Sequence, residues 1–328
     1  MAYSQTIAST TFTTDKLLSS AIRRCRVPAE QLTSEAWSIA SDQLFLFLSE
    51  LANQGVPLWA IQRQLYPLYE GQGAVTMTAG TVDVLNSNFR TTSEVTGTDT
   101  DSSTVHKVEF ESATGVSTVG IFWTATAVPI ALERSDDDAT WVTIQSETPD
   151  AASGEVTWYD LDAVVPALYF RVRATTGTLS FDQVYLGNNI SRIPLARLNR
   201  DDFTNLPNPV FSSDRVLQFW FDRQTPYPIM RFWPIPGSGA VEAQIEVWRH
   251  RQIMDVGTLT QEVEVPQRWY EAVVSGLARK LARELIEVDP AVIPQLDKDA
   301  ANAMYIAQGE ERDNSPVKWA PNIAMYTK

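Results

Sequence analysis

Few side chains in this sequence are of the kinds that build a catalytic or metal-binding site. Only two histidines are present, His106 and His250, and each falls in a separate segment that is predicted to be a strand. A metal centre or a histidine-based triad requires several His, Cys or carboxylate groups together. The sequence also lacks the motifs of phosphate-binding loops, zinc proteases and serine hydrolases. We therefore expect no catalytic residue, no metal site and no cofactor, and a protein that is not an enzyme.

Three consecutive carboxylates, Asp136–Asp138, are the nearest approach to a cation site. Carboxylate oxygens suit Ca²⁺, but the run lies between two predicted strands, and we interpret it as a solvated hairpin turn. The paired carboxylates of glycoside hydrolases come from positions far apart in a chain, and no feature of the sequence indicates such a pair.

Large aromatic side chains are the other chemical signal. Trp123, Trp141, Trp158 and Tyr159 fall in one region that is predicted to be rich in strands. An aromatic ring at the rim of a β-sandwich can stack on a sugar. Such residues more often fill the core between two sheets, and we favour that interpretation.

A second apolar group lies near the C-terminus, in a segment with two prolines and no periodicity. It consists of Trp319, Ile323, Met325 and Tyr326. So short a segment has no core of its own, so these side chains must stay exposed or pack on another surface. We predict that residues 313–328 form an extended tail that docks on a partner or a neighbouring subunit. The alternative is packing against the same subunit.

The charge and composition limit the partners of this protein. The chain has 328 residues and a net charge of −14 at pH 7, which argues against a protein that grips nucleic acid by neutralising phosphates. No apolar run reaches the ~18 residues that cross a bilayer, so we expect no membrane partner. The single cysteine, Cys25, excludes an internal disulfide and is expected to be a small core residue.

Helical periodicity identifies the scaffold that must position any site. The strongest signal covers residues 265–288, where apolar side chains recur at every fourth position. The face of this predicted helix contains Trp269, Val273, Gly276, Leu277 and Leu281. Small residues are interleaved with large ones, which allows a second helix to approach closely. Further helices are predicted over residues 14–25, 29–53 and 291–310.

Residues 86–189 have a different character, with strand-like runs separated by short turns. This pattern is typical of an antiparallel sandwich or jelly roll. Similar Asn-containing segments flank the region, so we predict a β-domain inserted into a discontinuous helical domain of residues 1–85 and 190–312. The predicted fold class is α+β: a helical scaffold with a small antiparallel β element, interrupted by an inserted jelly-roll β-sandwich.

Two separated blocks of the scaffold carry a recognisable pattern. The first is LSELANQGVPLWAIQRQLYPLYEGQ, over residues 48–72. The second contains IPL, RDDF, FWPIP and LARKLA, between residues 193 and 282. In this order they resemble the head-to-tail adaptors, also called connectors or tail accessory proteins, of short-tailed bacteriophages. The resemblance covers residues 14–85 and 190–310.

The resemblance implies a structural virion protein. Such adaptors form a ring, usually of twelve copies, under the portal, where they extend the DNA channel and seat the next tail component. The implied partners are further copies of the chain, the portal protein, tail nozzle or hub proteins and tail fibre proteins. Double-stranded DNA would pass through the lumen without specific binding. The helix over 265–288 would build the ring, and the tail over 313–328 would reach the portal. The implied location is the head–tail interface of a virion made in a bacterial cytoplasm.

The inserted region has a resemblance of its own. LERSDDDATWVTI followed by LYFRVRAT is similar to the discoidin, or coagulation-factor type C, jelly roll. The matching positions are Ser135, Asp136, Trp141, Arg171 and Arg173. That fold often binds sugars, so the alternative function is a carbohydrate-binding or host-recognition module on a helical carrier. A third possibility is an enzyme such as a cell-wall hydrolase.

Overall fold

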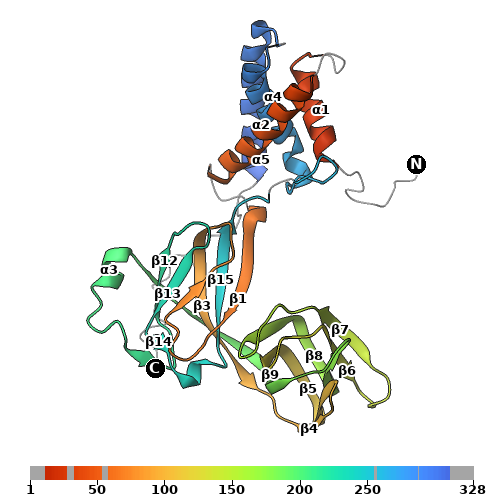
Figure 1. Ribbon diagram of the computed structural model, residues 1–328, viewed down its shortest axis with the longest axis vertical. Coiled ribbons are helices and arrows are strands. Elements are labelled where there is room, and N and C mark those ends of the chain that lie inside the picture. The colour runs from red at the N-terminus through yellow and green to blue at the C-terminus, as the bar shows by residue number, and fades with distance from the viewer. Residues whose placement is uncertain (1–11, 28–32, 54–57, 255–256, 287, 311–328) are drawn as a thin grey trace. The chain divides into compact units, whose positions relative to one another are not determined.

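The computed structural model describes residues 12–27, 33–53, 58–254, 257–286 and 288–310 (Figure 1). The chain divides into two compact units. The first combines Met1–Gln62 with His250–Lys328, and the second is Arg63–Arg249. The predicted docking tail lies outside the described residues.

The first unit is built around one helix. Its helices are α1 (Thr14–Arg24), α2 (Ser34–Asn53), α4 (Tyr270–Glu284) and α5 (Ile293–Glu310), with single 3-10 turns at Leu58–Ala60, Gln267–Trp269 and Pro290–Val292. Helix α4 contacts α1, α2 and α5. One core buries Val273, Leu277 and Leu281 on the apolar face of α4 together with Trp269 of the preceding 3-10 turn. No described helix is long and apolar enough to cross a membrane.

Helix α4 is shorter than the periodicity predicts. Within the predicted range 265–288, Pro266 lies before the helical region and residues 267–269 form a 3-10 turn. Leu285 has an extended backbone with φ −83° and ψ 122°, which ends the helix before the predicted limit at Val288. Leu285 and Val288, which extend the apolar repeat in the sequence, still pack into the core although they lie beyond the end of the helix.

Gly276 allows α2 and α4 to pack closely within one chain. A Cβ atom added at Gly276 would clash with the ring of Phe47, which is itself buried. The same core holds Cys25, whose thiol contacts the carbonyl oxygen of Ala278 at 3.3 Å. Cys25 lies in the apolar core, and burial there raises the pKa of its thiol to about 11.

The second unit contains a nine-stranded sheet in the order β1-β15-β3-β9-β5-β8-β6-β7, with β4 paired to β5 (Figure 1). The strands are β1 (Ile61–Pro67), β3 (Thr81–Glu94), β4 (Thr98–Asp101), β5 (Val105–Trp123), β6 (Ile130–Ser135), β7 (Val142–Glu147), β8 (Val156–Ala174), β9 (Phe181–Pro194) and β15 (Gln244–Arg251). Strands β5 and β8 are long, and their pairing shifts in register between Glu109 and Thr114. Such irregularities bend strands, and residues from both halves of β5 share one core.

A smaller sheet completes this unit. It has the order β10-β12-β13-β2, with β2 (Ala74–Thr76), β10 (Ala196–Leu198), β12 (Gln218–Asp222) and β13 (Ile229–Trp233). The parallel pair β11 (Ser212–Ser213) and β14 (Ile235–Pro236), the helix α3 (Arg200–Thr204) and a 3-10 turn at Ser238–Ala240 lie along the same stretch of chain. Alternate residues of β12 and β13 are buried in a second core with Val84, Phe89 and Ile245.

The predicted fold class is wrong, because β structure dominates the chain. A helical adaptor scaffold with a small β element is expected outside residues 86–189, yet β1, β3, β9 and β15 form one side of the large sheet. The described residues contain fifteen strands and five α-helices. Arg90 on β3 and Glu246 on β15 are charged, yet the fold buries both side chains. The alternation of Ile245 and Val247 with Gln244 and Glu246 predicts the strand β15 but not the burial of both its faces.

The predicted domain limits fall inside strands. Asn88 pairs with Pro194, and Glu94 pairs with Gly187, along the antiparallel strands β3 and β9. These two strands therefore continue from the first side of the sheet into the predicted insert without a connecting loop. The division into residues 1–85 with 190–312, 86–189 and 313–328 stays a prediction, and the compact units meet at other positions, between 62 and 63 and between 249 and 250.

Candidate functional site

A cleft opens where β5 ends and β8 and β9 begin. It has a volume of about 370 Å³ and is lined by Phe122, Trp123, Thr124, Ser153, Gly154, Glu155, Val156 and Asp182. Strand pairing explains why these residues meet. Phe122 on β5 lies opposite Val156 on β8 and opposite Gln183 on β9. Three chain segments that are far apart in the sequence therefore form one rim.

The turn Ser153–Glu155 forms one wall of the cleft and is held against β5. The Gly154 amide donates to the carbonyl oxygen of Trp123 at 2.8 Å, and the Trp123 amide donates to the carbonyl oxygen of Glu155 at 3.0 Å. The Ser153 hydroxyl donates to the carbonyl oxygen of Thr124 at 2.7 Å. Gly154 has φ +86°, in the left-handed region that favours glycine. The wall is therefore shaped before any ligand binds.

The Phe122 ring supplies an aromatic surface that neighbouring rings hold in place. It meets Trp158 edge-on, with ring centroids 6.1 Å apart, and Trp158 meets Tyr185 edge-on at 5.5 Å. Gly120 leaves the space that the Trp158 indole fills. Edge-to-face packing of this kind is favourable and directional. Phe122 itself is half-buried, so part of its surface remains accessible.

Two carboxylates and two hydroxyls share the cleft with Phe122. Glu155 Oε2 accepts a hydrogen bond from the Ala152 amide at 2.7 Å, and Oε1 has no partner among the described residues. The Asp182 side chain is exposed, and no described residue donates a hydrogen bond to it. Beside the turn, the Tyr69 hydroxyl accepts from the Val156 amide at 3.1 Å. Burial is the main cause that raises the pKa of Tyr69, and the negative charge of Glu155 raises it further.

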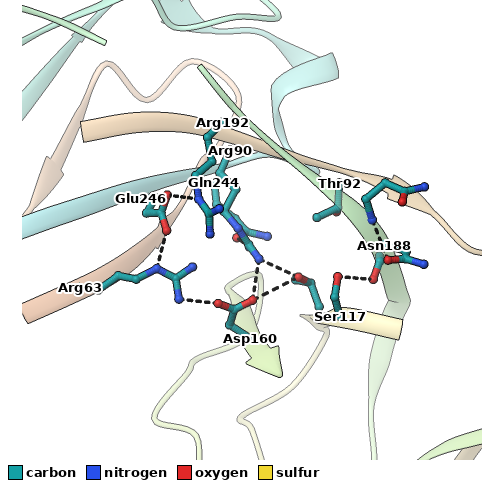
Figure 2. A network of polar contacts seen from close by, with 12 residues as sticks. Arg63, Arg90, Thr92, Ser117, Asp160, Asn188, Arg192, Gln244 and Glu246 are labelled. Atoms are coloured by element: carbon teal, nitrogen blue, oxygen red, sulfur yellow. Dashed lines mark hydrogen bonds and ion pairs between the residues drawn. The ribbon is translucent and has the colours of Figure 1, made fainter. Parts of the chain in front are cut away.

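A second polar feature, centred on Arg90, lies deeper in the same unit (Figure 2). The Arg90 side chain on β3 is fully buried. It donates to Asp160 Oδ1 at 2.6 Å, to Thr118 Oγ1 at 2.8 Å and to Gln244 Oε1. These partners come from β8, β5 and β15, so one guanidinium connects the sandwich strands to the strands on the other side of the sheet.

Glu246 on β15 is the second centre of this network (Figure 2). Its side chain is 1% exposed and receives Arg192 Nε at 2.6 Å and Arg63 Nε. Arg63 also binds Asp160 through Nη1, which joins the two centres. Three guanidinium groups and two carboxylates thus pair with one another where six strands meet. Because the groups are paired and both centres, Arg90 and Glu246, are buried, we assign the network a structural role and not a binding one.

We expect this network to make stability depend on pH. Burial alone would raise the pKa of Glu246, but hydrogen bonds from Arg192 and Arg63 outweigh it and hold the pKa below the usual 4.5. A carboxyl with a depressed pKa stabilises the fold above its unfolded pKa, and that stability is lost as pH falls through the folded value. The melting temperature of the protein should therefore decrease as the pH is lowered from about 5.

The variant Glu246→Gln tests the contribution of this carboxylate. Its melting temperature should be lower than that of the parent chain at about pH 7 and should fall less steeply between about pH 5 and about pH 3, where carboxyl groups ordinarily titrate. The exposed Asp201, paired with Arg200 at 3.3 Å, provides the control variant Asp201→Asn. Equal pH profiles for the Glu246 variant and the parent chain would contradict the assignment.

The two histidines do not meet. His106 lies on β5, where Nδ1 is 2.6 Å from Asp101 Oδ1, and its ring packs edge-on against Phe181. His250 is buried on β15. No described group of three or more His, Cys, Asp or Glu residues is arranged to hold a metal ion.

The carboxylates at 136–138 form a tight turn between β6 and β7. Asp137 Oδ1 accepts hydrogen bonds from the amides of Ala139 and Thr140 and from the Ser135 hydroxyl. These hydrogen bonds lower the pKa of Asp137, and the bond from the Thr140 amide has the largest effect, with that from the Ala139 amide second. Asp138 binds Lys107 at 2.7 Å. These contacts are those of the hairpin turn that the sequence predicts.

The predicted aromatic residues divide between core and surface. Trp123 and Tyr159 are buried in the sandwich core, which agrees with the favoured interpretation. Trp141 is half-buried, and the Arg171 guanidinium lies 3.9 Å from its ring centre. Arg171 and Arg173 both bind Glu133. Three of the five positions that match the discoidin pattern, Trp141, Arg171 and Arg173, therefore form one cluster with Glu133.

Sequence reasoning missed the residues that line the cleft. Phe122, Glu155 and Asp182 belong to no motif, and they are brought together only by the register of β5, β8 and β9. The adjacent pair Phe122-Trp123 carried the available signal. In a strand, neighbours point to opposite faces, so a buried Trp123 places Phe122 on the outer face.

Comparison with known proteins gives partial likenesses only. No protein-family model and no curated protein matches the sequence. Among solved structures, one similar chain is a family 32 carbohydrate-binding module from a family 31 glycoside hydrolase of Clostridium perfringens. The match has 12% identity and a TM-score of 0.24, and it covers 40% of this chain and 96% of that chain. The family 32 module of NanJ from C. perfringens, solved with galactose, matches with 10% identity, 42% and 97% coverage and a TM-score of 0.23. A fucose-binding module of Streptococcus pneumoniae matches with 20% identity, 26% and 63% coverage and a TM-score of 0.22.

These findings correct the adaptor resemblance. The sheet-dominated fold is not that of a helical adaptor, and no family model, that of an adaptor included, matches the sequence. The identification as a bacteriophage head-to-tail connector, and the virion, portal and DNA-ejection terms that follow from it, are therefore wrong. The ring of twelve copies and the other partners were implied by that resemblance and are not tested by the structure of a single chain.

Proposed function

We propose that this protein binds carbohydrate through the cleft between β5, β8 and β9, without catalysing a reaction. One observation carries the proposal: a preformed cleft of about 370 Å³ combines an accessible aromatic ring with carboxylates and hydroxyls. The proposal rests on the chemistry of the cleft. The likeness to solved carbohydrate-binding modules covers only part of the chain, and its TM-scores near 0.23 are too low to support an argument.

The cleft suits the two kinds of surface that a sugar presents. A pyranose ring has apolar C–H faces that pack on an aromatic ring, and Phe122 offers such a ring. Its hydroxyl groups donate hydrogen bonds, and the carboxylates of Glu155 and Asp182 accept them strongly. Small-molecule sites combine an apolar wall with a few polar groups in this way. The fixed turn and the packed ring reduce the ordering that binding requires.

The full chain, applied to a glycan array and followed by calorimetry with the best ligand, tests the proposal. Phe122→Leu keeps the apolar volume but removes the aromatic face, and we expect it to weaken binding about tenfold, which corresponds to about 1.4 kcal/mol. The melting temperature of the variant, compared with the parent, establishes that it is folded.

A matched control replaces an exposed aromatic residue outside the cleft. Tyr227 is 54% exposed and lies between β12 and β13, so Tyr227→Leu should leave glycan binding unchanged. The proposal fails if no glycan binds the parent chain, or if the Phe122 and Tyr227 variants bind the same glycan as tightly as the parent.

A further inference from the structure

The cleft carries a charge pattern that goes further than carbohydrate binding in general. Both ionisable residues in its lining, Glu155 and Asp182, are acidic, and the lining contains no Lys, Arg or His. The other polar side chains of the lining are the hydroxyls of Thr124 and Ser153. A ligand in this cleft therefore meets two negative charges without a neighbouring cation in the lining to neutralise them.

The two carboxylates differ from the other acidic groups that bind partners in this unit. Asp160, Glu246 and Glu133 are each held by two guanidinium groups. By contrast, Glu155 uses one oxygen to hold the Ala152 amide, and Asp182 receives no hydrogen bond from a described residue. Glu155 and Asp182 thus keep acceptor capacity in the lining of the cleft, where a ligand can reach it.

We infer that the cleft selects saccharides that carry a protonated amino group, such as oligomers of glucosamine, over N-acetylated or acidic saccharides. An ammonium group gains charge-assisted hydrogen bonds from Glu155 or Asp182, and these are about twice as strong as neutral ones. An N-acetyl group has no positive charge, and a uronic or sialic acid brings a third carboxylate into the cleft, which the two present would repel. This inference rests on the proposed function, because it names the ligand class of the same site.

The geometry of the cleft is compatible with such a ligand. The Phe122 ring and the turn Ser153–Glu155 lie in the same lining, so a sugar ring packed on Phe122 stays within the cleft that contains the carboxylates. The Glu155 oxygen that is free belongs to a side chain already anchored by its other oxygen. An anchored carboxylate loses less side-chain entropy when it binds a cation than a freely rotating one does.

Calorimetry of the full chain with two trisaccharides that differ only in N-acetylation tests the inference. We expect the glucosamine trimer to bind at least about tenfold more tightly than the N-acetylglucosamine trimer at about pH 6, where the amino groups are protonated. Raising the salt concentration should reduce this preference, because screening weakens charge–charge attraction.

The variants Asp182→Asn and Glu155→Gln identify the residues responsible. Each keeps the size of the side chain, and the amide oxygen of the glutamine introduced by Glu155→Gln can still accept from the Ala152 amide. We expect the double variant to bind the two trimers with affinities within about threefold of each other, while its melting temperature stays close to that of the parent. The exposed Asp201→Asn, outside the cleft, should keep the full preference.

The outcomes separate this inference from the function on which it rests. If both trimers bind with equal affinity and Phe122→Leu weakens both, the cleft binds carbohydrate and the preference for amino sugars is overturned. If the preference is present but the double carboxylate variant retains it, the assignment to Glu155 and Asp182 is overturned. If neither trimer nor any glycan on the array binds, both the inference and the proposed function are overturned.

Discussion

Replacing Arg90 with methionine should lower the free energy of unfolding by about 3–5 kcal/mol, the largest loss that we expect from one substitution outside the apolar cores. The Arg90 side chain is fully buried, and it is the shared partner of Asp160, Thr118 and Gln244. Methionine fills much of the space but donates no hydrogen bond. Asp160 would keep Arg63 and the long contact from the Thr118 hydroxyl at 3.5 Å. The buried acceptors Thr118 Oγ1 and Gln244 Oε1 would lose their donor, which is costly.

Denaturant unfolding of the full chain measures this loss, and a surface arginine provides the comparison. Arg200 is paired with Asp201, but both side chains are about three-quarters exposed, at 74% and 77%. Exposed pairs contribute ~0–1 kcal/mol, so Arg200→Met should unfold at nearly the same denaturant concentration as the parent. Similar midpoints for the Arg90 and Arg200 variants would show that the buried network does not hold the two sides of the sheet together.

Replacing Gly276 with leucine should lower the free energy of unfolding by about 3 kcal/mol, through overpacking between α2 and α4. A side chain at this position must enter the space that the buried Phe47 ring occupies. Leucine is the better helix former, so intrinsic propensity favours the substitution and packing opposes it. We expect packing to prevail because both helices are fixed in one core.

A double-mutant cycle shows whether the effect comes from Phe47. Phe47→Ala alone should cost about 3–5 kcal/mol as a cavity, and combined with Gly276→Leu it should cost at least about 1 kcal/mol less than the sum of the two. Gly309 in α5 has no atom near its missing Cβ, so Gly309→Ala should be neutral or stabilising. Additive losses at Gly276 and Phe47 would exclude a direct clash between these residues.

The sequence by itself determined the elements whose packing is local and periodic. The repeat at Val273, Leu277 and Leu281 predicts a buried helix, and these residues lie in the core of α4. Alternating residues between 86 and 189 predict antiparallel strands, and residues of that region form β5, β6, β7 and β8. The Asp136–Asp138 run predicts a turn. Each depends on a pattern that a segment carries without reference to distant residues.

Only the tertiary structure decided what pairs at long range. The strands β1, β3 and β15 carry the charged residues Arg63, Arg90 and Glu246, which become compatible with burial only when they pair with one another or with Asp160. The cleft arises in the same way, because the register of β5 against β8 and β9 brings Phe122, Glu155 and Asp182 to one rim. Pairing register is set by contacts between segments that are far apart in the sequence, and no pattern within one segment encodes it.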